Sequence, residues 1–289
     1  MSNRSDRTAM RRHVLRLLSA GLLVVGLGGF GLESIFAPRA DLWDVWEAHD
    51  PKSTIRVDHG AWGAFLKAFV RPGDDGFNRV AYGAVGAADK QALHGYLERL
   101  RQVDVAGLNR DEQLAFWINL YNALTVRLVV DFYPVKSIQD IDLSSGLFSS
   151  GPWDKKLIRI KDEMVSLNDI EHRILRPIWR DPRVHYAVNC ASVGCPNLAA
   201  APYTGANVEA MLNQAARDFI NSPRGVRRTG DGLVVSKIYA WFSEDFGGSE
   251  AMILDHLSRY AETDTEVKIL QTQDIDDYAY NCSLNDAGK

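Results

Sequence analysis

The spacing of apolar residues predicts that most of the chain is helical. In residues 43–70, Trp62, Phe65, Leu66 and Phe69 follow the i, i+3, i+4, i+7 pattern of an amphipathic helix, and Arg71-Pro72-Gly73 ends it. A helix that begins near Ser166 and runs to about Trp179 is expected next to polar residues that cap its start. The same helical spacing predicts three further helices, at residues 88–103, 207–220 and 249–260.

Residues 111–132 form a different kind of helix, because apolar side chains occupy almost every position. Such a helix is buried on most sides. Its length is sufficient for a membrane span, but Asn119, Asn122 and Arg127 interrupt the apolar run. We therefore expect it to be the central helix of a folded core.

Strand patterns are short and scattered between the helices. Residues 156–167 and 226–241 each predict a hairpin, and residues 77–85 and 184–189 each predict a single strand. Helices and strands are mixed without a strict βαβ order, which favours the α+β class. We expect one globular domain over residues 41–289, in which the central helix packs against a small mixed or antiparallel sheet.

The first 40 residues have the pattern of an export leader. Several arginines precede an uncharged run from Leu17 to Leu32, which fits the apolar core of a signal peptide and falls short of the ~20 residues that span a bilayer. We expect residues 1–40 to be a cleaved signal peptide or, alternatively, a retained membrane anchor. The pair Arg11-Arg12 leaves the twin-arginine route open beside general secretion. The domain is therefore expected in the periplasm or at the outer face of the inner membrane.

The net charge of the domain argues against one class of partner. The chain has 33 Lys and Arg against 37 Asp and Glu; six of the bases and two of the acids lie in residues 1–40, which leaves residues 41–289 a net charge of −8. A domain this acidic, without a local basic stripe, is not expected to bind nucleic acid. The expected partner is a small peptide, glycan or protein ligand of the cell envelope, with membrane contact only through an uncleaved leader.

The strongest candidate site lies in residues 181–197, which contain two of the three cysteines. Cys190 follows the predicted strand, and Gly194-Cys195-Pro196 comes shortly afterwards. This layout can present a thiol beside free backbone N–H groups, as an acyl-transfer nucleophile requires. In an oxidising compartment the two cysteines can instead form a disulfide, and inert buried thiols are a third reading. Metal ligation lacks a second ligand pair at the usual spacing, so neither a metal nor a cofactor is expected.

Two histidines are candidates for the base that a thiol nucleophile needs. His185 lies five positions before Cys190, which on an uninterrupted strand puts the two side chains on opposite faces. His172 lies on the preceding predicted helix, where Arg176 shares its face. Either imidazole can serve, and a surface position is the simpler reading of His172.

Two amides and a few neighbours complete the candidate site. Asn119 and Asn122 lie three residues apart on the apolar helix, where burying an unpaired amide costs about 1–3 kcal/mol. They either tie the helix to neighbouring backbone or orient a catalytic imidazole. Ligand binding is expected from polar groups close to the cysteines and to the helix histidine, namely Ser192, Cys195, Glu171 and Arg176.

Four blocks of sequence, in order, resemble the DUF547 family, a domain of unknown function. They are Asp111-Glu-Gln-Leu-Ala-Phe-Trp-Ile-Asn-Leu-Tyr-Asn-Ala-Leu124, Ile170-Glu-His-Arg-Ile-Leu-Arg-Pro177, His185-Tyr-Ala-Val-Asn-Cys-Ala-Ser-Val-Gly-Cys-Pro196 and Ser236-Lys-Ile-Tyr-Ala-Trp-Phe-Ser-Glu-Asp-Phe246. The resemblance runs from about residue 77 to the C-terminus, with a core at about residues 77–285, and implies no settled activity. The family's usual Tyr-Asp-Trp-Ser-Leu-Asn-like ending reads Tyr280-Asn-Cys-Ser-Leu-Asn285 here, so we interpret Cys282 as a local packing substitution.

Two functions from different classes follow from these residues. The first is a thiol-dependent hydrolase or acyltransferase that acts on an envelope amide or peptide, with Cys190 as nucleophile, His172 or His185 as base and one of the two helix amides as orienter. The alternative is a non-catalytic binding module of the envelope in which Cys190 and Cys195 form a structural disulfide.

Overall fold

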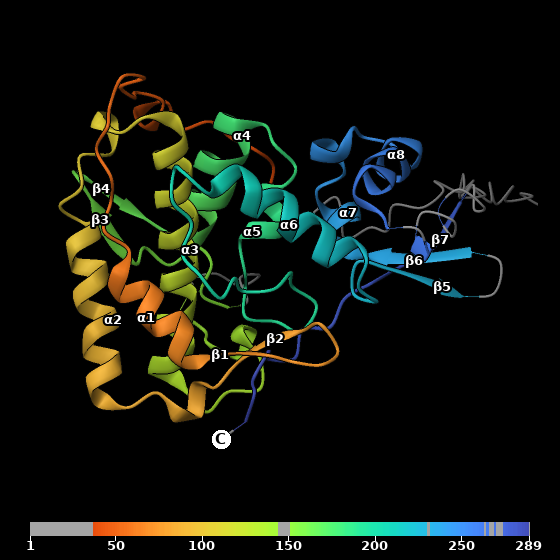
Figure 1. The fold of residues 1–289 in the computed structure, drawn as a ribbon, viewed down its shortest axis with the longest axis horizontal. Helices are drawn as coiled ribbons and strands as arrows, with labels where there is room; N and C mark the ends of the chain where they lie inside the picture. Colours follow the sequence, from red (N-terminus) through yellow and green to blue (C-terminus); the bar gives the residue numbers. More distant parts are fainter. Residues whose placement is uncertain are drawn as a thin grey trace, which may run out of the picture.

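Helices surround one long central helix in the computed structural model, which describes residues 37–143, 151–229, 232–262, 264–265, 269 and 274–288 (Figure 1). Nearly all of the expected leader lies outside these residues. The central helix, α3 (Arg110–Phe132), is buried along almost its whole length, and Asn109 caps it by accepting a hydrogen bond from the backbone N–H of Glu112. The prediction of a buried helix at this position is confirmed. None of the helices within the described ranges is long and apolar enough to cross a membrane.

The neighbours of α3 are mainly helices. It contacts α2 (Ala87–Leu100), the π-helix η6 (Asp169–Leu175) and α6 (Val208–Ile220). The helix α1 (Gly60–Phe69) packs on α2 in turn. The α+β class and the single domain are confirmed, with the central helix enclosed mostly by other helices.

The prediction of a helix over all of residues 43–70 is wrong in its first half. Apart from the 3-10 turn η2 (Asp44–Trp46), residues 43–59 are not helical, and the helix begins only at Gly60. Pro51 removes a backbone donor and clashes with a preceding helical turn, which breaks the pattern. Trp46 nevertheless reaches the core, where its ring meets Trp117 edge to face at 5.0 Å. This side chain anchors the N-terminal segment.

The strands form three small sheets. Two are antiparallel pairs, β1 (Val70–Pro72) with β2 (Asn78–Val80) and β3 (Ile158–Ile160) with β4 (Glu163–Val165). The third joins β5 (Val226–Thr229) antiparallel to β6 (Gly232–Ser236), which pairs in parallel with β7 (Ile275–Ala279). Both predicted hairpins are confirmed, although the second ends where a helix begins at Lys237. The strand predicted at residues 77–85 is limited to β2, which the 3-10 turn η3 (Tyr82–Ala84) follows.

The strand predicted at residues 184–189 is wrong, because Val184–Ala187 forms the short helix α5. Asp181-Pro182 starts a turn in which the backbone N–H of Val184 donates to the carbonyl of Asp181, and such a turn leads directly into a helix. The apolar run is therefore a buried helical turn. Periodicity alone cannot distinguish so short a helical turn from a buried strand. As a result, the strand argument about His185 and Cys190 does not apply.

The remaining helices lie at the end of the molecule that carries the mixed sheet (Figure 1). They are α7 (Lys237–Trp241) and α8 (Glu250–Tyr260), which pack with the strands β5, β6 and β7 around a second apolar core. The other short elements are α4 (Arg176–Trp179) and the 3-10 turns η4 (Val105–Gly107), η5 (Ile138–Asp140) and η7 (Ser243–Phe246).

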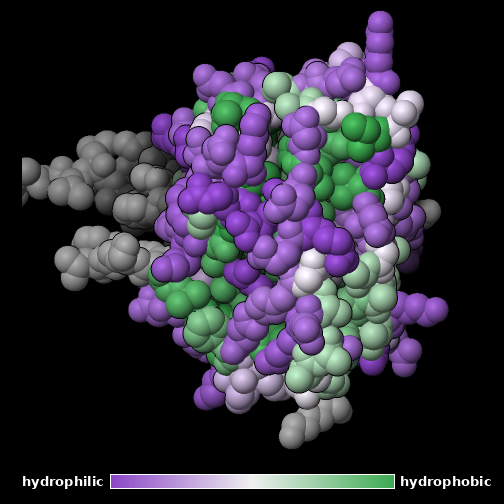
Figure 2. Space-filling view, turned by 90° about the vertical axis from the view of Figure 1, so that its left-hand side faces the viewer, coloured by the Kyte–Doolittle hydropathy of each residue, from purple (hydrophilic) through white to green (hydrophobic). Residues whose placement is uncertain are grey.

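Seen from the side of α1, α2 and the β3–β4 pair, the surface is largely hydrophilic, with apolar residues in patches between polar ones (Figure 2).

Candidate functional site

A cavity of about 420 Å³ lies where eight segments of the chain meet. Its buried wall comes from η6, α5 and the loop that follows α5, whereas Pro38, Gln139 and Asp154 are exposed and mark its mouth. Aromatic side chains form much of the remaining wall: Tyr121, Trp153, Trp241, Phe242 and Tyr280. Such a concave, partly apolar space with a few polar groups is the usual form of a ligand site.

The structure brings most of the sequence-predicted site residues to this cavity and leaves three outside its wall. The lining includes six of them: Glu171, His172, His185, Cys190, Ser192 and Cys195. Of the three outside, Arg176 contacts His172 of the wall and Asn122 binds the backbone on either side of Val188, whereas Asn119 binds Tyr203, which is not part of the wall. Cys282, interpreted from sequence as a packing substitution, also lines the cavity.

Cys190 and Cys195 form a disulfide in the cavity wall, with their Cα atoms 6.3 Å apart. The sequence allowed a reactive thiol, a disulfide or inert buried thiols at these positions, and the structure has the disulfide. The hydroxyl oxygen of Tyr280 lies 2.9 Å from the Cys190 sulfur and 3.1 Å from the Cys195 sulfur. Because a disulfide carries no S–H, the tyrosine is the donor in this arrangement. Sulfur atoms bonded in this way cannot act as thiolate nucleophiles.

The C-terminal segment holds the disulfide loop in place. Val193 and Gly194 donate backbone hydrogen bonds to the carbonyls of Ser283 and Asn281, at 2.7 and 2.8 Å. From the other side, the guanidinium of Arg224 donates to the carbonyl of Cys195 at 2.7 Å. The loop is therefore fixed on both sides by residues distant in sequence.

The two helix amides bind backbone and not imidazoles. Asn122 donates to the carbonyl of Ala187 at 2.9 Å and accepts from the N–H of Asn189 at 2.8 Å. Asn119 makes the same pair of bonds to Tyr203, at 2.7 and 3.1 Å. Each amide thereby satisfies a backbone donor and a backbone acceptor that would otherwise be buried unpaired. Of the two interpretations that the sequence allowed, the amides therefore tie the helix to neighbouring backbone. Asn122 in particular holds the chain between α5 and Cys190.

Behind the cavity, charged side chains form a closed network around His185. Its Nε2 lies 2.7 Å from a carboxylate oxygen of Asp245, and its Nδ1 lies 3.6 Å from one of Glu171. Arg176 pairs with the same Asp245 carboxylate at 2.5 Å. The ring of Phe242 stacks on His185 at 4.4 Å, and the Arg176 guanidinium lies over the same ring at 4.7 Å.

The network sets the charge on each group. Burial alone would lower the pKa of His185, but hydrogen bonds to Asp245 and Glu171 raise it above its ordinary value. Burial would likewise raise the pKa of both carboxylates, yet the neighbouring imidazoles and Arg176 lower it to about 2 in each. The raised pKa favours the protonated form of His185 between the two carboxylates, with Nε2 donating to Asp245 and Nδ1 facing Glu171. In this protonated form the ring has no free lone pair with which to act as a base.

His172 is in the opposite state. Burial lowers its pKa to about 4, and the attraction of Glu171 offsets this only in part, so the ring is neutral at pH 7. Its Nδ1 lies 3.1 Å from a guanidinium nitrogen of Arg176. Because Arg176 can only donate, Nδ1 is the acceptor and Nε2 carries the proton. In this state the Nε2–H of His172 is a hydrogen-bond donor, and its Nδ1 already accepts a hydrogen bond from Arg176.

Sequence reasoning missed several residues of the site. Asp245 lies in a family-like block but carries no local sign of a partner, since its contacts come from residues 60 and 69 positions earlier. Tyr280 is 90 positions from Cys190. The aromatic positions Trp241 and Phe242 look like ordinary core residues in the sequence. No spacing rule links such distant positions, although the block Ser236–Phe246 was a signal that this segment belongs with the others.

Comparison with known proteins finds a match to one family model. Residues 105–220 match the sequence model of a family described as "Protein of unknown function, DUF547". This range contains α3, η6, α5 and the disulfide loop, and so includes most of the buried cavity wall. No curated protein and no solved structure matches the chain.

Proposed function

As this chain carries a DUF547 domain, whose family has no assigned function, we propose from the site alone that it is an exported binding module which holds a small envelope ligand in the cavity beside the Cys190–Cys195 disulfide. The observation that carries the proposal is the bridge itself. Both cavity-facing sulfurs are bonded to each other, so the wall contributes shape and rigidity to the site and no nucleophile. The export leader expected from the sequence supports an oxidising compartment, in which such bridges persist.

The cavity has the features of a recognition site for a ligand with a hydrogen-bond acceptor and an apolar face. His172 offers an N–H, and the carboxylate of Glu171, whose pKa is lowered to about 2, stays ionised and accepts hydrogen bonds. Trp153 and Trp241 supply flat apolar surface. The polar groups are held by the network behind them, which reduces the entropy lost when a ligand is bound.

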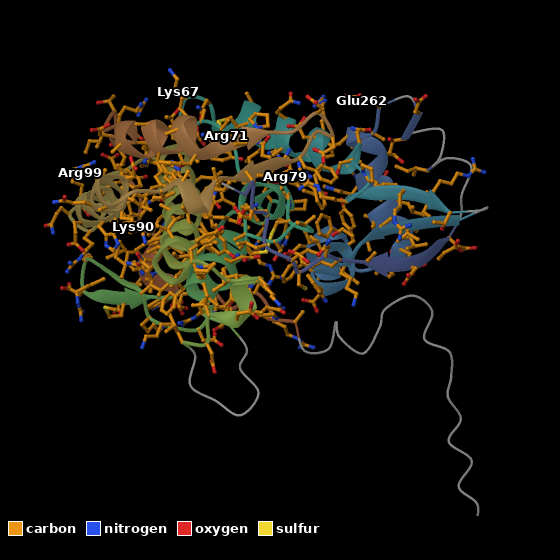
Figure 3. The ribbon with its side chains drawn as sticks, turned by 90° about the horizontal axis from the view of Figure 1, so that it is seen from below. Lys67, Arg71, Arg79, Lys90, Arg99 and Glu262 are labelled. Carbon is orange, nitrogen blue, oxygen red and sulfur yellow. A yellow bond between two sulfur atoms is a disulfide. The ribbon has the colours of Figure 1, made fainter. Side chains whose placement is uncertain are left out.

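Saturation-transfer NMR on the full chain tests this function. The probes are a mixture of N-acetyl amino-acid amides and chitotriose. We expect saturation transfer to at least one probe in the wild-type protein. The transfer should be lost in Asn168→Trp, because the larger side chain fills the cavity from a partly exposed position. It should be retained in Cys190→Ser/Cys195→Ser. Lys67→Trp is the matched control, because Lys67 projects from the outer face of α1 (Figure 3). Transfer that is equal in Asn168→Trp and wild type would exclude the cavity as the binding site.

One observation favours a second candidate, the thiol-dependent hydrolase or acyltransferase. Cys190 and His172 line the same cavity, so reduction of the bridge would place a thiol in a wall that already holds an N–H donor. We expect an enzyme of this kind to react with an iodoacetamide probe at about pH 6 after mild reduction, because activated thiols have a lowered pKa. Labelling of Cys190 no faster than that of glutathione, with Cys190→Ala as the blank, would argue against the enzyme.

A further inference from the structure

The segment just before the folded core lies across the mouth of the cavity. Ala37 and Pro38 form part of the cavity lining. From there the chain runs along η6 in an extended form: the backbone N–H of Asp41 donates to the carbonyl of His172 at 2.9 Å, and that of Trp43 donates to the carbonyl of Arg173 at 3.0 Å. We call residues 37–43 the strap.

A buried cation recognises the main chain of the strap. Arg176 has 4% of its surface exposed, and one of its guanidinium nitrogens donates to the carbonyl oxygen of Pro38 at 2.7 Å. The same guanidinium also contacts His172 and Asp245, so its position is set by the network and not by the strap. A fixed, buried donor aimed at a peptide carbonyl recognises polypeptide backbone whatever the side chains are.

The strap itself is held loosely. Pro38 and Asp41 are exposed, and the ion pair between Asp41 and Arg173, at 3.4 Å, involves an aspartate side chain that is 77% exposed. The Trp43 ring lies under the Arg173 guanidinium, 4.4 Å from it. The exposed ion pair is worth about 1 kcal/mol or less, and the cation–π contact between the two half-buried side chains is worth about 1–2 kcal/mol. The buried anchor of the segment is Trp46, which lies beyond the strap, whereas Trp43 is half-buried at the edge of the core. Departure of the strap therefore removes the contacts of Trp43 and leaves Trp46 in place.

From this geometry we propose that the ligand of the cavity is an extended polypeptide, which enters along η6 in place of the strap and sets a backbone carbonyl on Arg176. The strap is then the resting occupant of the site. This inference rests on the proposed binding function, names its ligand class, and applies to the chain that keeps residues 37–40, as it does if the leader is a retained anchor. Recognition of an added extended chain through backbone groups is an established mode of peptide binding.

The arrangement also predicts the selectivity of the site. The strap places Pro38 at the cavity wall, and proline has no N–H that would need a partner there. Backbone contacts with Arg176 and with the carbonyls of η6 tolerate varied side chains, whereas the cavity accepts small or apolar ones between aromatic walls.

Because the strap occupies the site at rest, a ligand competes with a tethered segment. The effective concentration of a segment on a short flexible tether is in the millimolar range.

Fluorescence anisotropy on the full chain tests the proposal, with a fluorescein-labelled peptide of the strap sequence Ala-Pro-Arg-Ala-Asp-Leu-Trp as probe. Asp41→Ala/Trp43→Ala weakens the strap and should bind the probe at least tenfold more tightly than wild type. A probe that is N-methylated at the amides equivalent to Asp41 and Trp43 should bind at least tenfold more weakly than the unmodified one. Equal affinity in wild type and variant, or no effect of N-methylation, would overturn the proposal.

Hydrogen exchange on the wild-type protein tests the same point without a substitution. Unlabelled probe peptide in millimolar excess should speed exchange at the amides of Asp41 and Trp43, because the strap is displaced, and should leave α3 unchanged. Unchanged exchange at both amides counts against displacement. If chitotriose or an N-acetyl amino-acid amide binds in a manner sensitive to Asn168→Trp while the peptide does not, the polypeptide inference fails and the binding function stands. If no probe binds, both fail.

Discussion

Acidification should destabilise this protein because three buried histidines are held neutral. His59, His172 and His256 are 4%, 5% and 6% exposed, and burial lowers the pKa of each to about 4. In the unfolded chain each histidine takes up a proton near pH 6.5. Since the folded pKa lies below the unfolded one, stability is complete above about pH 6.5 and is lost as the pH falls toward 4.

The size of the effect follows from proton linkage. Each histidine contributes up to about 1.4 kcal/mol per pH unit in this window, and three together contribute about 4 kcal/mol per unit. His185 adds nothing there, because its raised pKa gives stability that is fully present below about pH 6.5 and is lost only as the pH rises further. Glu171 and Asp245, with pKa values of about 2, lose their contributions only below about pH 4.

Urea unfolding followed by circular dichroism, between about pH 6.5 and 4.5, measures this slope directly. His172→Gln keeps an acceptor for Arg176 and removes one titrating group, so we expect the slope of unfolding free energy against pH to fall by about a third. Lys67→Ala, on the outer face of α1, is the control and should leave the slope unchanged. A flat wild-type profile, or a His172→Gln slope equal to the wild-type one, would refute the reasoning.

Three further substitutions test the support of the cavity by urea unfolding. Asn122→Ala leaves a buried N–H and a buried carbonyl without partners and should cost about 2–5 kcal/mol; a loss below about 1 kcal/mol would contradict its role as a brace. Arg176→Met removes one cation from Asp245, should cost about 3–5 kcal/mol, and should raise the pKa of that carboxylate in an NMR titration; an unshifted titration would speak against the pairing. Cys190→Ser/Cys195→Ser opens a loop with a sequence separation of five and should cost about 2 kcal/mol, a loss that reduction of the wild-type protein should match.

The sequence predicts elements of this fold best where one periodicity runs without competition. The central helix α3 has so many apolar positions that only a buried helix accommodates them, and its boundaries agree with the prediction within about a residue. Residues 184–189 were misread because four to six apolar residues fit a strand and a helical turn equally well. The helix α1 begins later than predicted because Pro51 interrupts helical backbone, and before Gly60 only the 3-10 turn at Asp44–Trp46 is helical.

The candidate site was predictable in its members more than in their roles. Residue types suited to catalysis led to Cys190, His172 and His185, which do share a cavity. The protonation states of the two histidines depend on burial and on contacts with Asp245 and Arg176, which arise only after the chain has folded. A sequence shows which titratable groups exist, whereas burial and the fixed partners of each ring nitrogen decide which ones carry a charge.

The contact between Tyr280 and the disulfide also has a consequence for biosynthesis. The tyrosine is 90 positions beyond Cys190, and at about 5–20 residues per second the ribosome needs roughly 5–18 s to cover that distance. During this interval the loop that contains both cysteines exists without the hydroxyl and the C-terminal backbone that later enclose it. If the chain is exported while it is being made, Cys190 and Cys195 meet an oxidant before Cys282 has been made, and the order of synthesis then favours the short-range pairing over any bridge to the third cysteine.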